Sequence, residues 1–237
     1  MATNAAILSA VAQAMKDPSK TRRTPATYLS VLNDAQIQII EDTECLKRMN
    51  TTAFTVVAGT QEYDVPSDFI SFPSDMSETK RGFVSIGTNG KYPLIPTKTE
   101  YLDLYTPNWR SSDAGVPQYF YMLEGATAKI GLYPKPSTTF VTDNGTAIFM
   151  KYIYDPGDIA DDSNLPFGNS TRLKFLQHLL KLWAIWLLNL EDQTFEKADR
   201  YKVFLDRELE RNQDRIMRLL EVPGAIGFDP GTRPDGM

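Results

Sequence analysis

The order of helical and strand-like segments constrains the fold of this chain more than any other feature. Residues 1–50 have a helical pattern, residues 51–156 alternate between apolar and polar residues with frequent turns, and residues 157–221 return to a helical pattern. Apolar residues three or four apart are typical of helices, and strict alternation is typical of strands. The sequence therefore predicts an α+β fold, in which a small antiparallel β-sandwich or barrel-like module is inserted into a helical bundle.

Two helices are expected before the strand-rich block. The first covers residues 4–15. The second begins at Pro25, behind the capping residue Thr24, and runs to about Met49. A basic, proline-bounded segment separates them and contains Lys16, Lys20, Arg22 and Arg23. Either a contact with phosphate or an acidic partner, or an ordinary solvated loop, would account for it.

Turn residues divide the block at 51–156 into six or seven short strands, as in a small sandwich or barrel. One hairpin is expected between residues 54–56 and 63–65. A second is expected between 83–86 and 92–95, around an Asn-Gly turn. Longer strands are predicted at 118–124, 128–133 and 146–154, and one helical turn at 99–105.

A helix at 171–190 has apolar residues on nearly every side. Such a helix is buried in a core or in a contact between subunits. Trp183, Trp186 and Leu187 are therefore the candidates for subunit packing. Trp183 is expected between the helix at 25–49 and the last helix of the chain.

The last helix, from about residue 194 to residue 220, combines an apolar stripe with many charges. Its arginines lie four, four and three residues apart and share one face: Arg207, Arg211, Arg215 and Arg218. Carboxylates interleave with them. A solvated charged helix, an interface with another protein and a contact with DNA phosphates are therefore all compatible with the pattern.

Residues 222–237 are predicted to form an extended C-terminal tail that is mobile in the free subunit. Gly and Pro recur every few residues there, so no regular element can form. The apolar anchors of this tail are Val222, Ile226 and Phe228.

No catalytic or cofactor-binding constellation is evident. The net charge of −5 gives no overall basic footprint for nucleic acid, and a single cysteine, Cys45, excludes an internal disulfide. A catalytic site would need a cleft joining the single histidine, His178, to the Asp-rich loop at 155–162, and an ion site in that loop stays open. No segment has the length of a membrane span, and no cofactor is predicted.

Several short motifs in this order resemble the head–tail adaptor (connector) proteins of tailed bacteriophages. They are LNDAQIQII in the helix after Thr24, GTQEYDVPSDF at 59–69, GVPQYFY at 115–121, GLYPKP at 131–136 and the two terminal helices. The resemblance covers roughly residues 24–221.

The resemblance implies a non-enzymatic virion protein of the neck, at the head–tail junction, assembled in the host cytoplasm. A ring of subunits, typically a dodecamer, would dock beneath the portal protein and receive tail or nozzle proteins. DNA would pass through its channel without sequence-specific binding. The arginine face and the tail from Val222 onward suit the portal-facing role, and a closed heterologous ring buries two different patches per subunit.

A second interpretation is a β-sandwich module that binds carbohydrate or a receptor, with the helices as an oligomerisation stalk. Five aromatic residues would stack on sugars in this case: Tyr101, Tyr105, Trp109, Tyr119 and Tyr121. Alternatively, they fill the core of the sheets. A groove that gathers Trp109 and exposed tyrosines would favour sugar binding.

Overall fold

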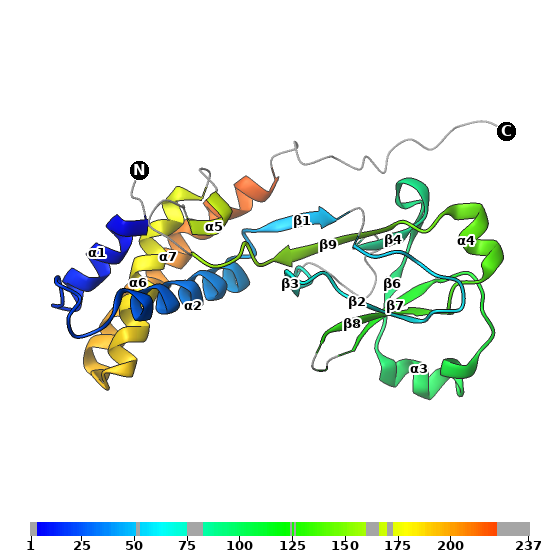
Figure 1. The fold of residues 1–237 in the computed structure, drawn as a ribbon, viewed down its shortest axis with the longest axis horizontal. Helices are drawn as coiled ribbons and strands as arrows, with labels where there is room; N and C mark the ends of the chain where they lie inside the picture. The colour runs from blue at the N-terminus through cyan, green and yellow to red at the C-terminus, as the bar shows by residue number, and fades with distance from the viewer. Residues whose placement is uncertain are drawn as a thin grey trace. The chain divides into compact units, whose positions relative to one another are not determined.

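The computed structural model describes residues 4–50, 53–74, 83–123, 125, 127–159, 166–169 and 173–221 (Figure 1). These residues belong to two compact units. The helical unit takes Met1–Cys45 and Asp158–Met237, and the β unit takes Leu46–Gly157. Helices and two sheets confirm the predicted α+β class.

The helical unit is built from long helices at both ends of its sequence. They are α1 (Asn4–Ala14), α2 (Pro25–Thr43), α6 (Gln177–Glu191) and α7 (Phe195–Glu221), with a short α5 (Pro166–Asn169) and a 3₁₀ turn at Lys174–Leu176. Thr24 caps α2 as expected, because its side chain accepts a hydrogen bond from the N–H of Thr27.

The predicted ends of two helices are wrong. α2 ends at Thr43 rather than Met49, because Glu44 adopts a left-handed conformation with φ of 49°. The backbone N–H of Glu44 donates a hydrogen bond to the carbonyl of Ile40 and so caps the helix. The residues after it join a sheet. α6 begins at Gln177 rather than at 171, and the 3₁₀ turn precedes it.

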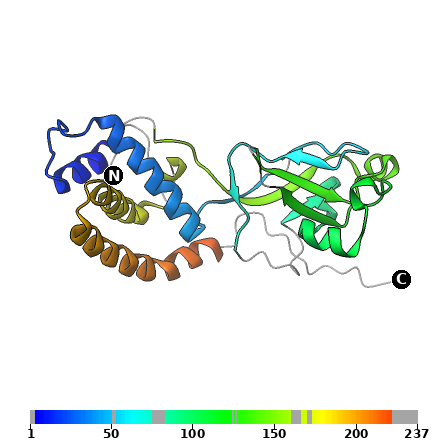
Figure 2. The ribbon, with the colours of Figure 1, turned by 90° about the horizontal axis from the view of Figure 1, so that it is seen from below.

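α6 is the centre of the helical unit, because α1, α2 and α7 all pack on it. Figure 2 shows the yellow α6 between the blue α2 and the orange α7. Its fully covered residues include Leu179, Leu180, Ala184 and Leu188. Most of the all-round apolar surface of this helix is therefore buried within a single subunit.

The β unit contains two sheets. The larger has the order β1 (Lys47–Asn50), β9 (Ile148–Tyr154), β4 (Val84–Ile86), β5 (Tyr92–Pro93), and β3 (Phe69–Ser71) also pairs with β9. The smaller has the order β2 (Glu62–Asp64), β8 (Lys129–Tyr133), β7 (Tyr119–Leu123), β6 (Ile95–Pro96). Described strand pairs are antiparallel except β6 with β7. Two short helices accompany them, α3 (Thr99–Tyr105) and α4 (Thr138–Asn144).

One apolar cluster joins the two sheets. Ile148, Met150 and Tyr152 point into it from β9, as the alternation predicted, and Phe120 and Leu132 enter it from the smaller sheet. The β unit therefore has a core of its own. The edge strand β1 is also fastened by Arg48, which donates to the Tyr152 hydroxyl at 2.8 and 3.0 Å.

Two of the predicted local pairings form, and one does not. β4 pairs with β5, and β7 pairs with β8, as expected. The hairpin predicted between residues 54–56 and 63–65 is wrong, because β2 pairs with β8 instead and Thr55 bridges to Ala147. The Tyr63 hydroxyl donates to the carbonyls of the intervening turn, so this turn is held without a strand pair. The helix α4, for which Ser137 supplies the cap, was not predicted.

Gly131 offers a sharp test of the packing in the smaller sheet. A Cβ at this position would lie 2.0 Å from the ring of Tyr121, which is its cross-strand partner and is buried. We expect Gly131→Ala to lower the free energy of unfolding by about 1–3 kcal/mol, measured by urea denaturation. Gly115→Ala is the control, because its Cβ would meet Pro134 at an ordinary 3.6 Å. Equal stability of the two variants would contradict this packing.

Candidate functional site on the helical unit

α7 separates its charges around the helix axis. Ala198 and Leu205 are fully buried and define its inner side. At about 3.6 residues per turn, one side of the exposed surface carries Lys197, Arg200, Arg207 and Arg211, here called the cationic flank. The other side carries Glu196, Asp199, Asp206 and Glu210, here called the acidic flank. All eight side chains are exposed.

The four predicted arginines have different surroundings. Arg207 is exposed and makes no ion pair with a described residue. Arg211 pairs with Glu208 at 2.7 Å, a predicted i,i+3 pair. The guanidinium of Arg215 lies 4.3 Å from the ring centroid of Phe175. The side chain of Arg218, and with it the predicted Asp214 pair, lies outside the described residues, as do Val222, Ile226 and Phe228.

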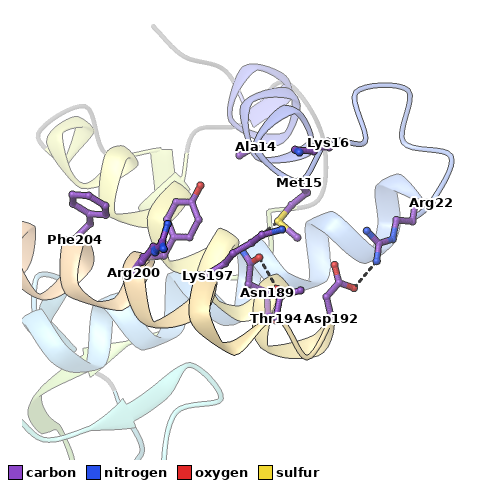
Figure 3. Close-up of a pocket in the computed structure, with 11 residues that line it drawn as sticks. Ala14, Met15, Lys16, Arg22, Asn189, Asp192, Thr194, Lys197, Arg200 and Phe204 are labelled. Carbon is purple, nitrogen blue, oxygen red and sulfur yellow. Dashed lines mark hydrogen bonds and ion pairs between the residues drawn. The ribbon is translucent and has the colours of Figure 1, made fainter.

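A cleft of about 490 Å³ lies beside the N-terminal part of α7 (Figure 3). Four cationic side chains line it: Lys16, Arg22, Lys197 and Arg200. Tyr201 and Phe204 supply aromatic surface. Asp192 is the acidic residue of the lining. Its carboxylate already forms ion pairs with Arg22 at 3.2 Å and with Arg23 at 2.5 Å. The cleft therefore extends the cationic flank with an excess of positive charge.

The basic segment between α1 and α2 is held in place by Asp17, which is 4% exposed. Its carboxylate accepts from the N–H groups of Thr21 at 2.9 Å, Arg22 at 3.2 Å and Arg23 at 3.1 Å, and from the Tyr28 hydroxyl at 3.0 Å. Half of the predicted basic segment is thus tied down inside the subunit, since Arg22 and Arg23 pair with Asp192 at the end of α6.

These contacts determine how Asp17 titrates. Burial alone would raise the pKa of the Asp17 carboxyl, but the hydrogen bonds from Arg22, Arg23, Thr21 and Tyr28 outweigh it and hold the pKa below its ordinary value. The charged form of Asp17 is therefore the form that the folded loop stabilises.

A second cleft, of about 520 Å³, lies between α2 and α6. Its floor is apolar and includes Trp183, Trp186 and Leu187, and Asp34 and Glu191 stand at its rim. Trp183 is only 3% exposed, and the Lys202 ammonium of α7 lies 5.6 Å from its ring centroid. Trp183 therefore belongs to the core of the subunit, between α2 and α7 as predicted. Trp186 and Leu187 are half-buried and face the cleft.

The residues considered for catalysis are not brought together. His178 is exposed on α6, and Asp161 and Asp162 lie outside the described residues. Cys45 is buried, and burial raises the pKa of its thiol to about 11, so the thiolate is scarce at neutral pH. Within the described ranges, no group of three or more His, Cys, Asp or Glu side chains is arranged to hold a metal ion. None of the described helices is long and apolar enough to cross a membrane.

Two of the aromatic residues considered for sugar binding are buried in the β unit. Trp109 is 2% exposed, donates to Asp103 at 2.7 Å and packs edge-on against Tyr121, which is buried too. Tyr101 and Tyr105 are exposed and stack on each other on α3. Trp109 and Tyr121 are therefore core residues, as the alternative of core packing expected, and the cluster of Trp109 with exposed tyrosines that would favour sugar binding does not form among them.

Sequence reasoning missed the N-terminal part of the cationic flank. Lys197, Arg200 and Phe204 continue the three- and four-residue steps of the arginine face toward the start of the helix. Extending that pattern backwards would have found them. The role of Asp17 had no comparable signal, because its partners become neighbours only when the loop folds.

The exposed flanks of opposite charge on α7 are surfaces of the kind that other macromolecules contact. Residues 2–224 match the SU10 adaptor protein family, and the chain therefore belongs to that family. The family is one of bacteriophage adaptors, which are structural components of the virion. No curated protein matches the chain significantly. The resemblance read from the sequence motifs is thus confirmed.

The Asp17 loop leads to a pH-dependent expectation. A carboxyl whose folded pKa is lowered contributes stability above its unfolded pKa and loses that contribution as the pH falls through the folded pKa. We expect Asp17→Asn to lower the melting temperature at pH 7. This difference in melting temperature from the wild type should shrink at pH values below 3.8, the ordinary pKa of an aspartate carboxyl. Asp113→Asn, at an exposed position, is the control. A difference that is the same at pH 7 and pH 3 would refute this role of the Asp17 charge.

Proposed function

We propose that this protein is a ring-forming head–tail adaptor that docks on the portal and joins it to the tail around the DNA channel. The observation that carries the proposal is the family membership over residues 2–224. Its role is structural rather than enzymatic and requires no cofactor. Its place is the neck of the virion, at the head–tail junction, after assembly in the host cytoplasm.

Ring formation is supported by the two clefts of the helical unit. One is basic and lies beside α7, and the other is apolar with an acidic rim and lies between α2 and α6. A heterologous ring requires two different patches on each subunit, and these surfaces meet that requirement. We assign Trp186 and Leu187 to subunit packing, with Trp183 supporting them from the core. A dodecamer is the ring size that the family resemblance implies.

For portal docking, we assign the C-terminal end of the arginine face together with the segment that follows it. This surface comprises Arg215, Arg218, Val222, Ile226 and Phe228. Charged groups near the end of a helix combined with apolar residues in the segment that follows suit a contact that sums many small interactions. Such a contact has to offset an ordering cost of about 1–2 kcal/mol per residue.

The β unit supplies a surface for tail or nozzle proteins. α3 exposes Leu104 at 67% and Tyr105 at 74%, beside the exposed Tyr101. Contiguous apolar side chains of this kind mark protein contacts.

DNA passes through the ring without sequence-specific binding, and a net charge of −5 suits a channel wall that DNA slides past.

The docking assignment is tested by deleting residues 222–237. The remaining chain is expected to keep its circular dichroism spectrum and melting temperature, because the two units retain their cores. It should lose co-sedimentation with rings of the cognate portal protein. Full-length Tyr105→Ser, altered on α3, is the control and should still bind the portal. Truncated protein that assembles into particles at normal yield would refute the assignment.

The two tryptophans of the α2–α6 cleft separate folding from assembly. Trp183→Ala should lower the free energy of unfolding by about 3–5 kcal/mol in urea denaturation, because it removes a large buried side chain. Trp186→Ala should cost clearly less stability, since Trp186 is half-buried, and should reduce the ring fraction in native mass spectrometry. A Trp183→Ala protein as stable as the wild type would contradict the assigned core packing. A Trp186→Ala protein that assembles normally would contradict the assigned subunit contact.

A further inference from the structure

α7 contains a repeated pair of neighbouring residues, an acid followed by a base. The pairs are Glu196-Lys197, Asp199-Arg200, Asp206-Arg207, Glu210-Arg211 and Asp214-Arg215. The steps between pairs are three, seven, four and four residues. Steps of this kind return to the same side of a helix, so the acids whose side chains the structure describes join the acidic flank and the bases join the cationic flank.

Most of these charges are not neutralised within the subunit. Lys197, Arg200 and Arg207 on the cationic flank make no ion pair with any described residue, and neither do Glu196, Asp199 and Glu210 on the acidic flank. The exceptions are Asp206, which pairs with Lys202 at 2.8 Å, and Arg211, which pairs with Glu208. Two exposed strips of opposite sign therefore run along the same helix.

Each flank also exposes an apolar side chain. Phe204, 53% exposed, lies among the cations, and Phe195 and Val203, 61% and 58% exposed, lie on the acidic side. Large apolar residues on both strips favour a packed contact over a purely solvated helix. The basic cleft beside Lys197 and Arg200 adds room and two further cations, Lys16 and Arg22, at the same end.

We propose that the cationic flank of α7 in one copy packs against the acidic flank of α7 in the next copy. In this contact α7 runs along the ring axis, so that copies related by rotation about the axis have parallel helices at the same height. Each base then faces the acid of the same pair in its neighbour, as Arg200 would face Asp199. The inference rests on the proposed ring and names the surface that holds it together.

The charge pattern disfavours a symmetric dimer that is centred on either flank alone. Such an isologous contact buries the same flank on both copies and would oppose like charges. A heterologous contact joins unlike flanks and repeats from copy to copy. Arg207 and Arg211 are thereby assigned to the neighbouring copy, and Arg215 and Arg218 are left for the portal end of the helix.

A charge exchange between flanks tests the contact. Lys197→Glu with Arg200→Glu makes both flanks acidic at this level, and Glu196→Lys with Asp199→Lys makes both cationic. Each variant alone should shift in native mass spectrometry from the ring to the 26.7 kDa monomer while keeping the wild-type circular dichroism spectrum. A one-to-one mixture should regain assembly, as alternating rings with an even number of copies. The chain carrying all four changes should assemble by itself.

The controls separate this contact from net charge and from DNA binding. Lys91→Glu with Lys98→Glu makes the same change in net charge at exposed positions of the β unit and should leave the ring intact. Salt should weaken the wild-type ring, because the Debye length is about 3 Å at 1 M. Binding to a fluorescent DNA duplex is measured for every variant and should not follow the loss of the ring.

Failure of the α7 contact and failure of the ring give different results. If the wild type forms rings and both reversed variants do so equally well, the α7 contact is wrong and the ring stands. The α7 contact is also wrong if the mixture or the four-change chain fails to regain assembly. If the variants keep the ring but lose DNA binding, DNA occupies the cationic flank and the inference is overturned. A wild-type chain that is monomeric both alone and on portal rings would overturn the ring as well.

Discussion

The burial of α6 is the constraint on which the rest of the helical unit depends. A helix with apolar residues on nearly every side needs several neighbours, and burial of each large apolar side chain contributes about 1.5–3 kcal/mol. α1 and α2 cover it from the start of the chain and α7 covers it from the end. The chain must therefore leave the helical unit after α2 and return before α6, and whatever lies between has to fold as an insertion.

The β unit meets that requirement because its core is self-contained. Side chains from both sheets meet in one cluster, and the edge strand β1 is fastened through Arg48, Tyr152 and Asp68. The close contact of Tyr121 with Gly131 and the burial of Trp109 complete a second, smaller aromatic cluster. Trp109 and Tyr121, which a sugar-binding module would display, are thus used here for packing, which agrees with a scaffold role.

α7 connects folding to function because its sides have separate tasks. The inner side holds α6 through Ala198 and Leu205, whereas the exposed flanks carry opposite charges. A single amphipathic helix can thereby complete a core and still present two different contact surfaces. The Asp17 loop supports one of them, because it positions Arg22 beside Asp192 at the edge of the basic cleft.

The sequence by itself determined the type of most elements and the family of the protein. Periodicity is a local property, so the alternation of β9, the turn between β4 and β5, the single helical segment at α3 and the charged face of α7 were all predictable. Only the tertiary structure decided which segments pair and where helices end. α2 ends early because the residues after Glu44 join β9, and β2 pairs with β8 rather than with its neighbour in sequence. The basic cleft joins Lys16 and Arg22 to Asp192 and Lys197. Residues so far apart in the sequence become neighbours through the packing of α1, α6 and α7. The periodicity within each segment does not specify that packing.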